Sequence, residues 1–255
     1  MSEPKLYKYL DVKGGLKMLK DSNLQFTNAT QLNDPFDCHP ALIDFSNVPA
    51  EACKNWSARD IERLQNSRYQ RNRDKAWICS LSKVNNALLM WSYYGAHQGV
   101  CIGLDMEKAN KYLSKIQCSV FQGTIEMEVQ YKKIVEKPDY YSNLLEDYYR
   151  YQFSTKAIEW KHEQEVRLLL IEPSQMFVKM LPPDNLKGKD FYDIKELRAY
   201  PQLGGECFES LYLGIKIDED KKAEIIKTAL TCNPNIKIYQ MEIDPKAFKL
   251  KEIQI

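Results

Sequence analysis

Apolar residues recur along this chain at two spacings, which together predict short strands separated by helices. Runs that alternate or stay apolar over a few residues are typical of strands, whereas apolar positions three or four apart favour helices. The expected strands cover residues 6–10, 24–28, 77–82, 99–105, 165–171, 211–217, 236–243 and 248–255, with two more within 116–135. The expected helices cover residues 16–20, 50–75, 87–94, 138–159 and 218–230, and residues 172–210 are expected to be loop-like.

The order of these elements indicates the fold class. Strands and helices do not alternate regularly enough for a doubly wound fold, so we expect an α+β fold with a largely antiparallel, split or sandwiched sheet. At 255 residues the chain can bury a full core as one domain. It has no internal repeat or low-complexity segment. We therefore expect a single domain over residues 1–255, with helical insertions around residues 50–75 and 138–159.

Composition narrows the classes of partner and compartment. The chain has 36 Lys and Arg against 35 Asp and Glu, a formal net charge of +1, so no overall field attracts nucleic acid or an anionic membrane. Its 7 cysteines are scattered and never spaced as Cys-x-x-Cys, which favours a reducing compartment. No apolar run reaches membrane-spanning length. We expect a cytoplasmic protein without a membrane partner.

Charged residues gather at the start of the apolar strand 165–171. Glu163, Glu165 and Arg167 are two residues apart, so in an extended strand they project from one face. Two carboxylates about 7 Å apart repel each other, and a folded protein keeps them when a cation lies between them or when one does chemistry. The alternative is a structural ion-pair ladder with Arg167 as the internal partner.

A second pair of glutamates, Glu126 and Glu128, has the same spacing. It lacks the lead-in Trp160 and a following arginine, and Lys132 and Lys133 come shortly after it. We assign this pair a structural, solvated role.

Several common sites are absent from the sequence. The chain has no G-x-G-x-x-G and no G-x-x-x-x-G-K-[ST], which makes a Rossmann or P-loop enzyme an unsuitable interpretation. The three histidines, His39, His97 and His162, have no metal-ligand spacing, so no metal is expected.

Hydroxyl and aromatic side chains follow one another in the middle of the chain. Ser80 and Ser82 share one face of the strand 77–82. Trp91, Tyr93 and Tyr94 come soon after and supply aromatic surface that suits a flat heteroaromatic ring. Earlier, residues 33–37 read Asn-Asp-Pro-Phe-Asp, which predicts a turn locked by an Asx side chain. The alternative is that this loop rims a cleft.

Five blocks of this sequence resemble a bacterial family known as domain of unknown function 2971. They are residues 6–9, 33–37, 79–82, 90–100 and 160–167, and the resemblance spans residues 6–217. That family looks like a branch of the ADP-ribosyltransferase superfamily, whose members carry an Arg or His on the first strand. A Ser-x-Ser on a central strand and a Glu-x-Glu on a late strand complete the superfamily pattern.

The resemblance implies a split β-sheet that clamps NAD, which these enzymes use as a substrate. The first element is Lys8 or Tyr9 here, where an Arg or His is usual. Lysine can meet a phosphate as a point charge but lacks the bidentate fork of arginine. Ser80 and Ser82 would be the second element, and the Glu-x-Glu at 163–165 the third.

The resemblance also implies roles for these residues. Glu165 would stabilise the ribose cation formed when the nicotinamide bond breaks. Glu163 would position the acceptor or water, and Ser80 would orient Glu165 or the ribose. The remaining NAD contacts would be Lys8, Tyr9, Ser82, Trp91, Tyr93 and Tyr94.

The expected activity is transfer of ADP-ribose to a macromolecular acceptor, protein or nucleic acid, or hydrolysis of NAD. The alternative is a catalytically inactive interaction module on the same scaffold. Geometry distinguishes the two, because an enzyme of this kind would place Tyr9, Ser80 and Glu165 along one cleft.

Overall fold

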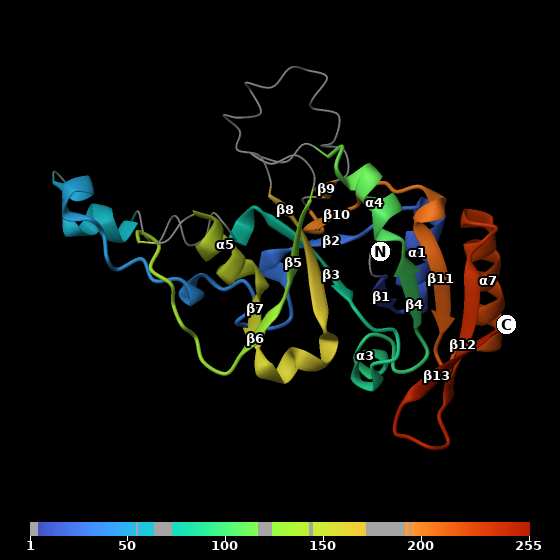
Figure 1. The fold of residues 1–255 in the computed structure, drawn as a ribbon. Helices are drawn as coiled ribbons and strands as arrows, with labels where there is room; N and C mark the ends of the chain where they lie inside the picture. Colours follow the sequence, from blue (N-terminus) through green and yellow to red (C-terminus); the bar gives the residue numbers. More distant parts are fainter. Residues whose placement is uncertain are drawn as a thin grey trace.

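A mostly antiparallel β-sheet forms the centre of the molecule (Figure 1). The structure is a computed structural model, and it describes residues 5–54, 56–63, 73–116, 124–142, 145–171, 192–193 and 195–255. The strands are β1 Leu6–Leu10, β2 Phe26–Asn28, β3 Ala76–Ser82, β4 Val100–Leu104, β5 Ile125–Glu128, β6 Gln130–Lys132, β7 Thr155–Ala157, β8 Glu165–Ile171, β9 Tyr192–Asp193, β10 Arg198–Ala199, β11 Phe208–Leu213, β12 Lys237–Ile243 and β13 Leu250–Gln254. The α-helices are α1 Val12–Asp21, α3 Leu88–Tyr93, α4 Met106–Leu113, α5 Leu145–Ser154 and α7 Glu219–Cys232. The 3-10 helices are η1 Ala29–Gln31, η2 Pro40–Leu42, η3 Ala50–Cys53, η4 Ile158–Glu163 and η6 Gly205–Cys207.

The sheet runs in the order β13-β12-β11-β4-β1-β3-β2-β10-β9, and β8 pairs with both β3 and β5. Its ladders are antiparallel except for β11 with β12. The short strands β6 and β7 form a separate parallel pair. Among the described residues, no helix is long and apolar enough to cross a membrane.

The sheet is narrowly joined between β1 and β3. These strands share one registered pair, Tyr7 with Ser82, whereas β1 pairs with β4 along its full length and β3 pairs with β8 along its full length. Beyond that pair, the Lys8 ammonium donates a hydrogen bond to the Ser80 carbonyl at 2.9 Å. A side chain therefore takes the place of ladder hydrogen bonds at the joint.

The two faces of the sheet are covered differently. One face packs against α1, α4 and α7 in the largest apolar cluster, which includes Cys79 and Leu81 of β3. On the opposite face, α3 covers one apolar cluster through Trp91 and α5 covers another through Phe153. Because side chains alternate along a strand, Ser80 of β3 points to this second face. The polar residues of β3 and β8 lie between its two clusters.

The α+β class with a mostly antiparallel sheet is confirmed. The strand containing residues 6–10 and those containing 77–82 and 165–171 are neighbours in one sheet, as predicted. The helix predicted over residues 87–94 is α3.

Some predicted boundaries are wrong. The helix expected over residues 138–159 is limited to α5, after which the chain forms β7 and η4. The expected loop over residues 172–210 contains β9 and β10, and its first twenty residues lie outside the described part. In the segment 50–75, η3 and helical residues 58–63 are described, whereas residues 64–72 are not. Residues 117–123 also lie outside the described part.

Candidate functional site

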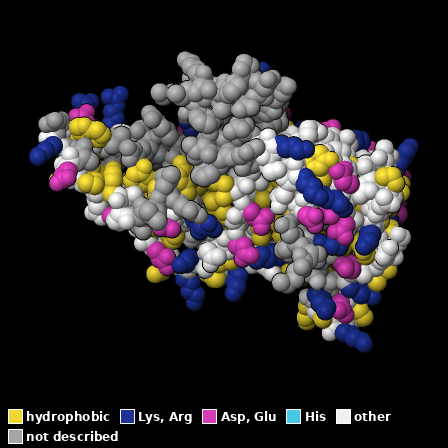
Figure 2. All heavy atoms as spheres, turned by 45° about the horizontal axis from the view of Figure 1, so that its top comes forward, with side chains coloured by type: hydrophobic (Ala, Val, Ile, Leu, Met, Phe, Trp, Pro, Cys, Tyr) yellow, Lys and Arg dark blue, Asp and Glu magenta, His cyan; other side chains and the backbone are white. Residues whose placement is uncertain are grey.

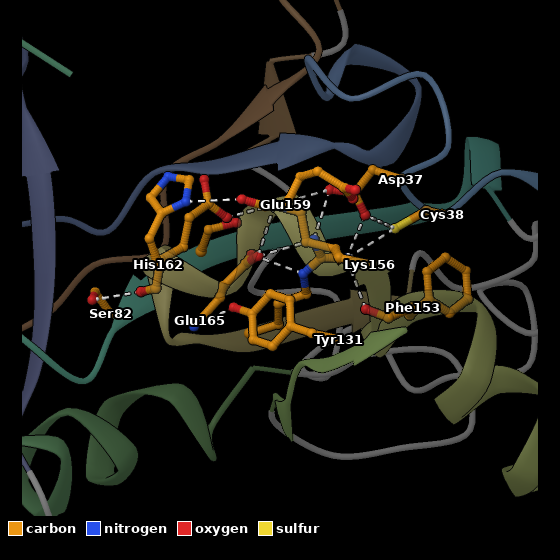
Figure 3. Close-up of polar contacts among 12 residues, drawn as sticks. Asp37, Cys38, Ser82, Tyr131, Phe153, Lys156, Glu159, His162 and Glu165 are labelled. Carbon is orange, nitrogen blue, oxygen red and sulfur yellow. Dashed lines mark hydrogen bonds and ion pairs between the residues drawn. The ribbon is translucent and has the colours of Figure 1, made fainter. Parts of the chain in front are cut away.

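A buried group of five charged side chains lies between β8, η4 and the loop after β2. We call Asp37, Lys156, Glu163, Glu165 and Arg167 the charged cluster; all five are buried. In Figure 3, Lys156 and Glu165 lie near the centre of the view, with Asp37 and Phe153 to one side and Ser82 and His162 to the other. The cluster therefore joins segments that are far apart in the sequence.

Arg167 organises the inner half of the cluster. Its Nη1 and Nη2 donate to Asp37 Oδ1 and Oδ2 at 2.7 and 2.6 Å. Its Nε and Nη2 donate to Glu165 Oε1 and Oε2 at 2.8 and 3.2 Å, and Nη1 also donates to the Phe153 carbonyl at 2.9 Å. A guanidinium has five N–H donors. All of them are used here, so Arg167 is held rigidly.

Lys156 organises the outer half. Its Nζ lies 2.6 Å from Glu163 Oε2 and 3.0 Å from Glu165 Oε2, and 3.7 Å from Asp37 Oδ2. The ammonium is also 5.0 Å from the centroid of the Trp160 ring, within cation–π range. A cation does lie between the two glutamates, which is one of the two explanations that the sequence suggested. That cation is Lys156, whereas Arg167 binds only Glu165 of the pair.

The charges of the cluster do not cancel. Three carboxylates face two cations, which leaves one negative charge in excess when all are ionised. Burial acts to raise the pKa of Glu165, but the positive charges of Arg167 and Lys156 outweigh it and lower that pKa to about 2. Burial, with the charge of Glu165 added, raises the pKa of Glu163 against the opposing effect of Lys156. Glu163 is therefore the carboxylate of this pair that takes up a proton first.

The backbone is in the left-handed region at two positions beside the acidic residues of the cluster. Gln164, between the two glutamates, has φ 44°, and Cys38, next to Asp37, has φ 54°. Such values cost about 1–3 kcal/mol for residues with a Cβ and persist where the surroundings enforce them. The turn at Gln164 brings the carboxylates of Glu163 and Glu165 together on Lys156.

This turn corrects the prediction that all three charged residues share one strand face. Glu165 and Arg167 share one face of β8 as predicted, but Glu163 ends η4 and precedes the strand. Side chains fix the turn: Ser82 Oγ donates to the Glu163 carbonyl at 2.7 Å, and the Glu165 amide donates to Tyr131 Oη at 2.8 Å.

An aromatic rim borders the cluster on the side of Glu163. The Tyr94 hydroxyl donates to Glu163 Oε1 at 3.3 Å, and burial raises the pKa of that hydroxyl. Tyr93 is 62% exposed, and its ring centroid lies 5.9 Å from that of His162. We call Tyr93, Tyr94, Trp160 and His162 the aromatic rim. Tyr93 and Tyr94 are exposed, whereas Trp160 and His162 are half-buried.

Five of the predicted site residues lie together: Ser80, Ser82, Tyr94, Glu163 and Glu165. Ser80 and Ser82 are paired in register with Arg167 and Glu165. The Ser80 hydroxyl makes a small contribution to the low pKa of Glu165, after Arg167 and Lys156. Tyr94 reaches Glu163 directly.

Other predicted residues lie elsewhere. Tyr9 is 5% exposed, donates to the Val84 carbonyl and packs edge-on against Trp91 at 5.4 Å. Trp91 is also buried, with Nε1 donating to the Asn85 carbonyl. Both side chains belong to the apolar core under α3. Glu165 is 3% exposed, so the cleft expected to hold Tyr9, Ser80 and Glu165 is not open.

Lys8 lies on the other face of the sheet. It alternates with Tyr9 and shares its face with Leu6 and Leu10, which pack in the cluster under α1, α4 and α7. Its ammonium also lowers the pKa of the Cys79 thiol against the stronger raising effect of burial. Lys8 is therefore separated from the charged cluster by the sheet.

Sequence reasoning missed Lys156 and gave Asp37 no role of its own. The loop at residues 33–37 is a turn lock as predicted, because Asp34 Oδ1 accepts from the Phe36 amide at 2.9 Å. The last residue of the same loop, Asp37, turns inward to Arg167. The distinctive sequence of that block, Asn-Asp-Pro-Phe-Asp, was the available signal for Asp37. Lys156 lies in a charged, Tyr-rich stretch that offers no such signal.

Among the described residues, no group of three or more His, Cys, Asp or Glu side chains is placed to hold a metal ion.

Residues 90–168 match one family model. It is described as "Protein of unknown function (DUF2971)". The matched stretch begins within α3 and contains α5, η4 and the cluster residues from Lys156 to Arg167, but neither Asp37 nor β3. It is shorter than the span 6–217 that the sequence blocks indicated, and it gives no link to ADP-ribosyltransferases. No curated protein and no solved structure matches the chain.

Proposed function

We propose that the protein binds NAD as a substrate and cleaves its nicotinamide–ribose bond, passing ADP-ribose to a macromolecular acceptor or to water. The observation that carries this proposal is the charged cluster, with one negative charge in excess next to a partly exposed aromatic rim. Breaking the nicotinamide bond builds positive charge on the ribose. A fixed negative charge in a poorly solvated site stabilises that charge in the transition state.

Stability alone is a poor explanation of the cluster. Burying ions costs several kcal/mol for each, and buried ion pairs are often no more stabilising than apolar side chains of the same volume. This cluster also has unequal charges and left-handed backbone at Gln164 and Cys38. Perturbed carboxylates and backbone strain of this kind concentrate at functional sites.

The arrangement of strands supports the same proposal. The resemblance to ADP-ribosyltransferases places its three elements on strands 6–10, 77–82 and 165–171, and these are adjacent as β1, β3 and β8. The joint between β1 and β3 is narrow, as a split sheet requires. Ser82 and Glu165 face each other across β3 and β8.

Within this proposal the roles of the two glutamates change. Both oxygens of Glu165 are bound by Arg167 and one also by Lys156, so Glu165 is a positioning residue that holds the cations. Glu163 keeps one oxygen in a long contact with Tyr94, and its raised pKa suits a general base. Glu163 is therefore the carboxylate that meets the reacting groups.

The reaction can be written with these residues. The bond between ribose C1′ and the nicotinamide nitrogen breaks, and its electron pair leaves with nicotinamide. The O–H or N–H group of the acceptor, or water, bonds to C1′, and its proton passes to the carboxylate of Glu163. Access requires Tyr94 to move, because Glu163 is only 3% exposed beneath it.

The residues at the rim fit the nicotinamide and ribose half of NAD. Tyr93 and Trp160 offer ring faces for nicotinamide, and Ser80 and Tyr94 offer hydroxyls for the ribose. Lys8 does not serve the diphosphate in this arrangement, because it lies on the opposite face of the sheet.

The proposal is tested by incubating the purified protein with NAD labelled in the adenine, following nicotinamide release by chromatography and label transfer to added cell lysate. We expect nicotinamide release by the wild-type protein. Glu128→Gln is the matched control, because Glu128 has the same Glu-x-Glu spacing but is exposed and paired with Lys83, and it should leave the rate unchanged. Absence of both NAD binding and nicotinamide release would contradict the proposal.

A second candidate is a catalytically inactive interaction module. The near-complete burial of Glu163 and Glu165 favours it, since no substrate atom reaches either carboxylate without a movement of Tyr94. In this case Glu165→Gln lowers the free energy of unfolding, and neither Glu163→Gln nor Glu165→Gln changes any NAD chemistry.

A further inference from the structure

A groove of about 530 Å³ separates the hairpin of β12 and β13 from the start of α3. The hairpin projects beyond the end of the sheet in Figure 1. Figure 2 shows apolar, basic and a few acidic side chains together on this projection, at the lower right. The apolar residues that line the groove are Leu88, Ile215, Ile243, Phe248 and Leu250.

The apolar side chains of the groove are unusually exposed. Phe248 at the hairpin turn is fully exposed, Ile243 is 69% exposed and Leu88 is 45% exposed. Single exposed apolar residues are ordinary, but several that line one recess mark an interaction surface. Large apolar side chains on both walls give a partner somewhere to bury its own.

The charged side chains of the groove are mainly positive. Lys216, Lys246 and Lys249 line it together with one acidic residue, Asp244. Asp244 lies 3.6 Å from Lys249 and neutralises it. Lys216 and Lys246 have no carboxylate at ion-pair distance among the described residues. The groove therefore presents apolar surface flanked by two uncompensated positive charges.

We infer that this groove docks a segment of another protein that carries apolar side chains flanked by carboxylates. Apolar side chains would fill the recess, and the carboxylates would meet Lys216 and Lys246. An anionic lipid surface is the alternative occupant, and the test below includes it as an outcome. A second copy that docked groove to groove would place the same lysines opposite one another, which is unfavourable.

The groove and the aromatic rim lie at opposite ends of the short helix α3. Leu88 at the start of α3 borders the groove, and Tyr93 at the end of the same short helix belongs to the aromatic rim. A partner held in the groove would lie beside the rim. Docking itself depends only on the groove and needs no NAD chemistry.

The test is selection of a phage-displayed library of random twelve-residue peptides on the immobilised full-length protein. The same library is selected in parallel on the immobilised double variant Ile243→Ser/Phe248→Ser as the control. These two side chains are exposed and outside the charged cluster, so the variant should fold, and its melting temperature is checked against wild type. We expect enriched peptides with apolar residues and Asp or Glu. Their dissociation constants, measured by fluorescence anisotropy, should rise at least about tenfold in the double variant.

A charge reversal separates the apolar and electrostatic parts. The double variant Lys216→Glu/Lys246→Glu should bind the same peptides at least about tenfold more weakly. It should bind more tightly the versions of these peptides in which Lys replaces Asp and Glu. The inference is overturned if no peptide is enriched, if enriched peptides are basic, or if either variant binds them as wild type does. Two further results would also overturn it. One is that the wild-type protein binds anionic phospholipid vesicles and Ile243→Ser/Phe248→Ser does not. The other is that the wild-type protein self-associates in sedimentation and the double variant does not.

Discussion

Two Glu-x-Glu segments of identical spacing, one within β5 and one from the end of η4 to the start of β8, have opposite surroundings. In β5, Glu126 and Glu128 are exposed, and Glu128 pairs with Lys83 at 2.7 Å on the surface. At the start of β8, Glu163 and Glu165 are buried against Lys156, and Glu165 also binds Arg167. The two segments differ in what covers them.

The position of each strand explains the difference. Within the described part of the chain β5 pairs on one edge only, with β8, so its polar residues meet water. β8 is enclosed between β3 and β5, and the loop at residues 33–37 covers its polar face. The spacing of charges sets which residues can share a face, but long-range packing decides whether they are solvated. Of these glutamates, the buried pair Glu163 and Glu165 has shifted pKa values.

The largest expected difference between the two segments is in stability. Arg167→Met removes the internal partner of two buried carboxylates and should lower the free energy of unfolding by about 3–5 kcal/mol. The measurement is urea denaturation at neutral pH. Adding Glu165→Gln to Arg167→Met should recover part of the loss, because one unpaired charge disappears. A loss below about 1 kcal/mol would show that the cluster is solvated like the β5 pair.

The pH dependence of stability is the next effect. The pKa of Glu165 is about 2 in the folded protein, below its ordinary value of 4.5, so its contribution is complete above 4.5 and is lost as the pH falls through about 2. The contribution is on the order of 3 kcal/mol. Glu163 has the opposite sign: because its pKa is raised, its contribution to stability grows as the pH falls toward 4.5.

Denaturant unfolding of wild type, Glu165→Gln and Glu163→Gln between pH 2 and pH 7 measures both effects. The acid loss should shrink in Glu165→Gln and remain in Glu163→Gln. Identical acid profiles for the three proteins would disprove the assignment of these pKa shifts.

The turn that carries Asp37 should contribute less. Asp34 accepts a hydrogen bond from the Phe36 amide, and Asp34→Ala removes this local cap. We expect a loss of about 1 kcal/mol in the free energy of unfolding, measured by thermal and urea denaturation. An unchanged melting temperature together with lost NAD binding would reverse this assignment and make Asp34 a binding residue.

The smallest effect is expected at the exposed pair. Lys83→Met removes the partner of Glu128 on the surface and should change the free energy of unfolding by less than about 1 kcal/mol. A cost comparable to that of Arg167→Met would mean that exposure does not separate the two segments.

The main strands and helix α3 could be predicted because their apolar patterns are local and strong. The segment 138–159 could not be divided correctly, because β7 is three residues long and pairs with β6, which lies more than twenty residues earlier. A pattern over so few residues does not distinguish the end of a helix from a short strand.

For the candidate site, the sequence identified the Glu-x-Glu-x-Arg segment and the serines opposite it. It also gave a cation between the glutamates as one of two explanations for the pair. It did not identify that cation, because Lys156 reaches the cluster only after the chain has turned through η4. It also placed Tyr9, Trp91 and Lys8 at the site, since adjacency of strands is visible in sequence blocks but the face on which a side chain lies depends on register.

The central claim is that Glu163 is the carboxylate that meets the reacting groups. It is tested most directly by comparing nicotinamide release from NAD by wild type and Glu163→Gln, with NAD affinity measured separately by calorimetry. Loss of one general base should lower the rate about a hundredfold or more while NAD affinity changes little. The Glu128→Gln control should match wild type. A Glu163→Gln protein that is folded, binds NAD and releases nicotinamide at the wild-type rate would contradict the account.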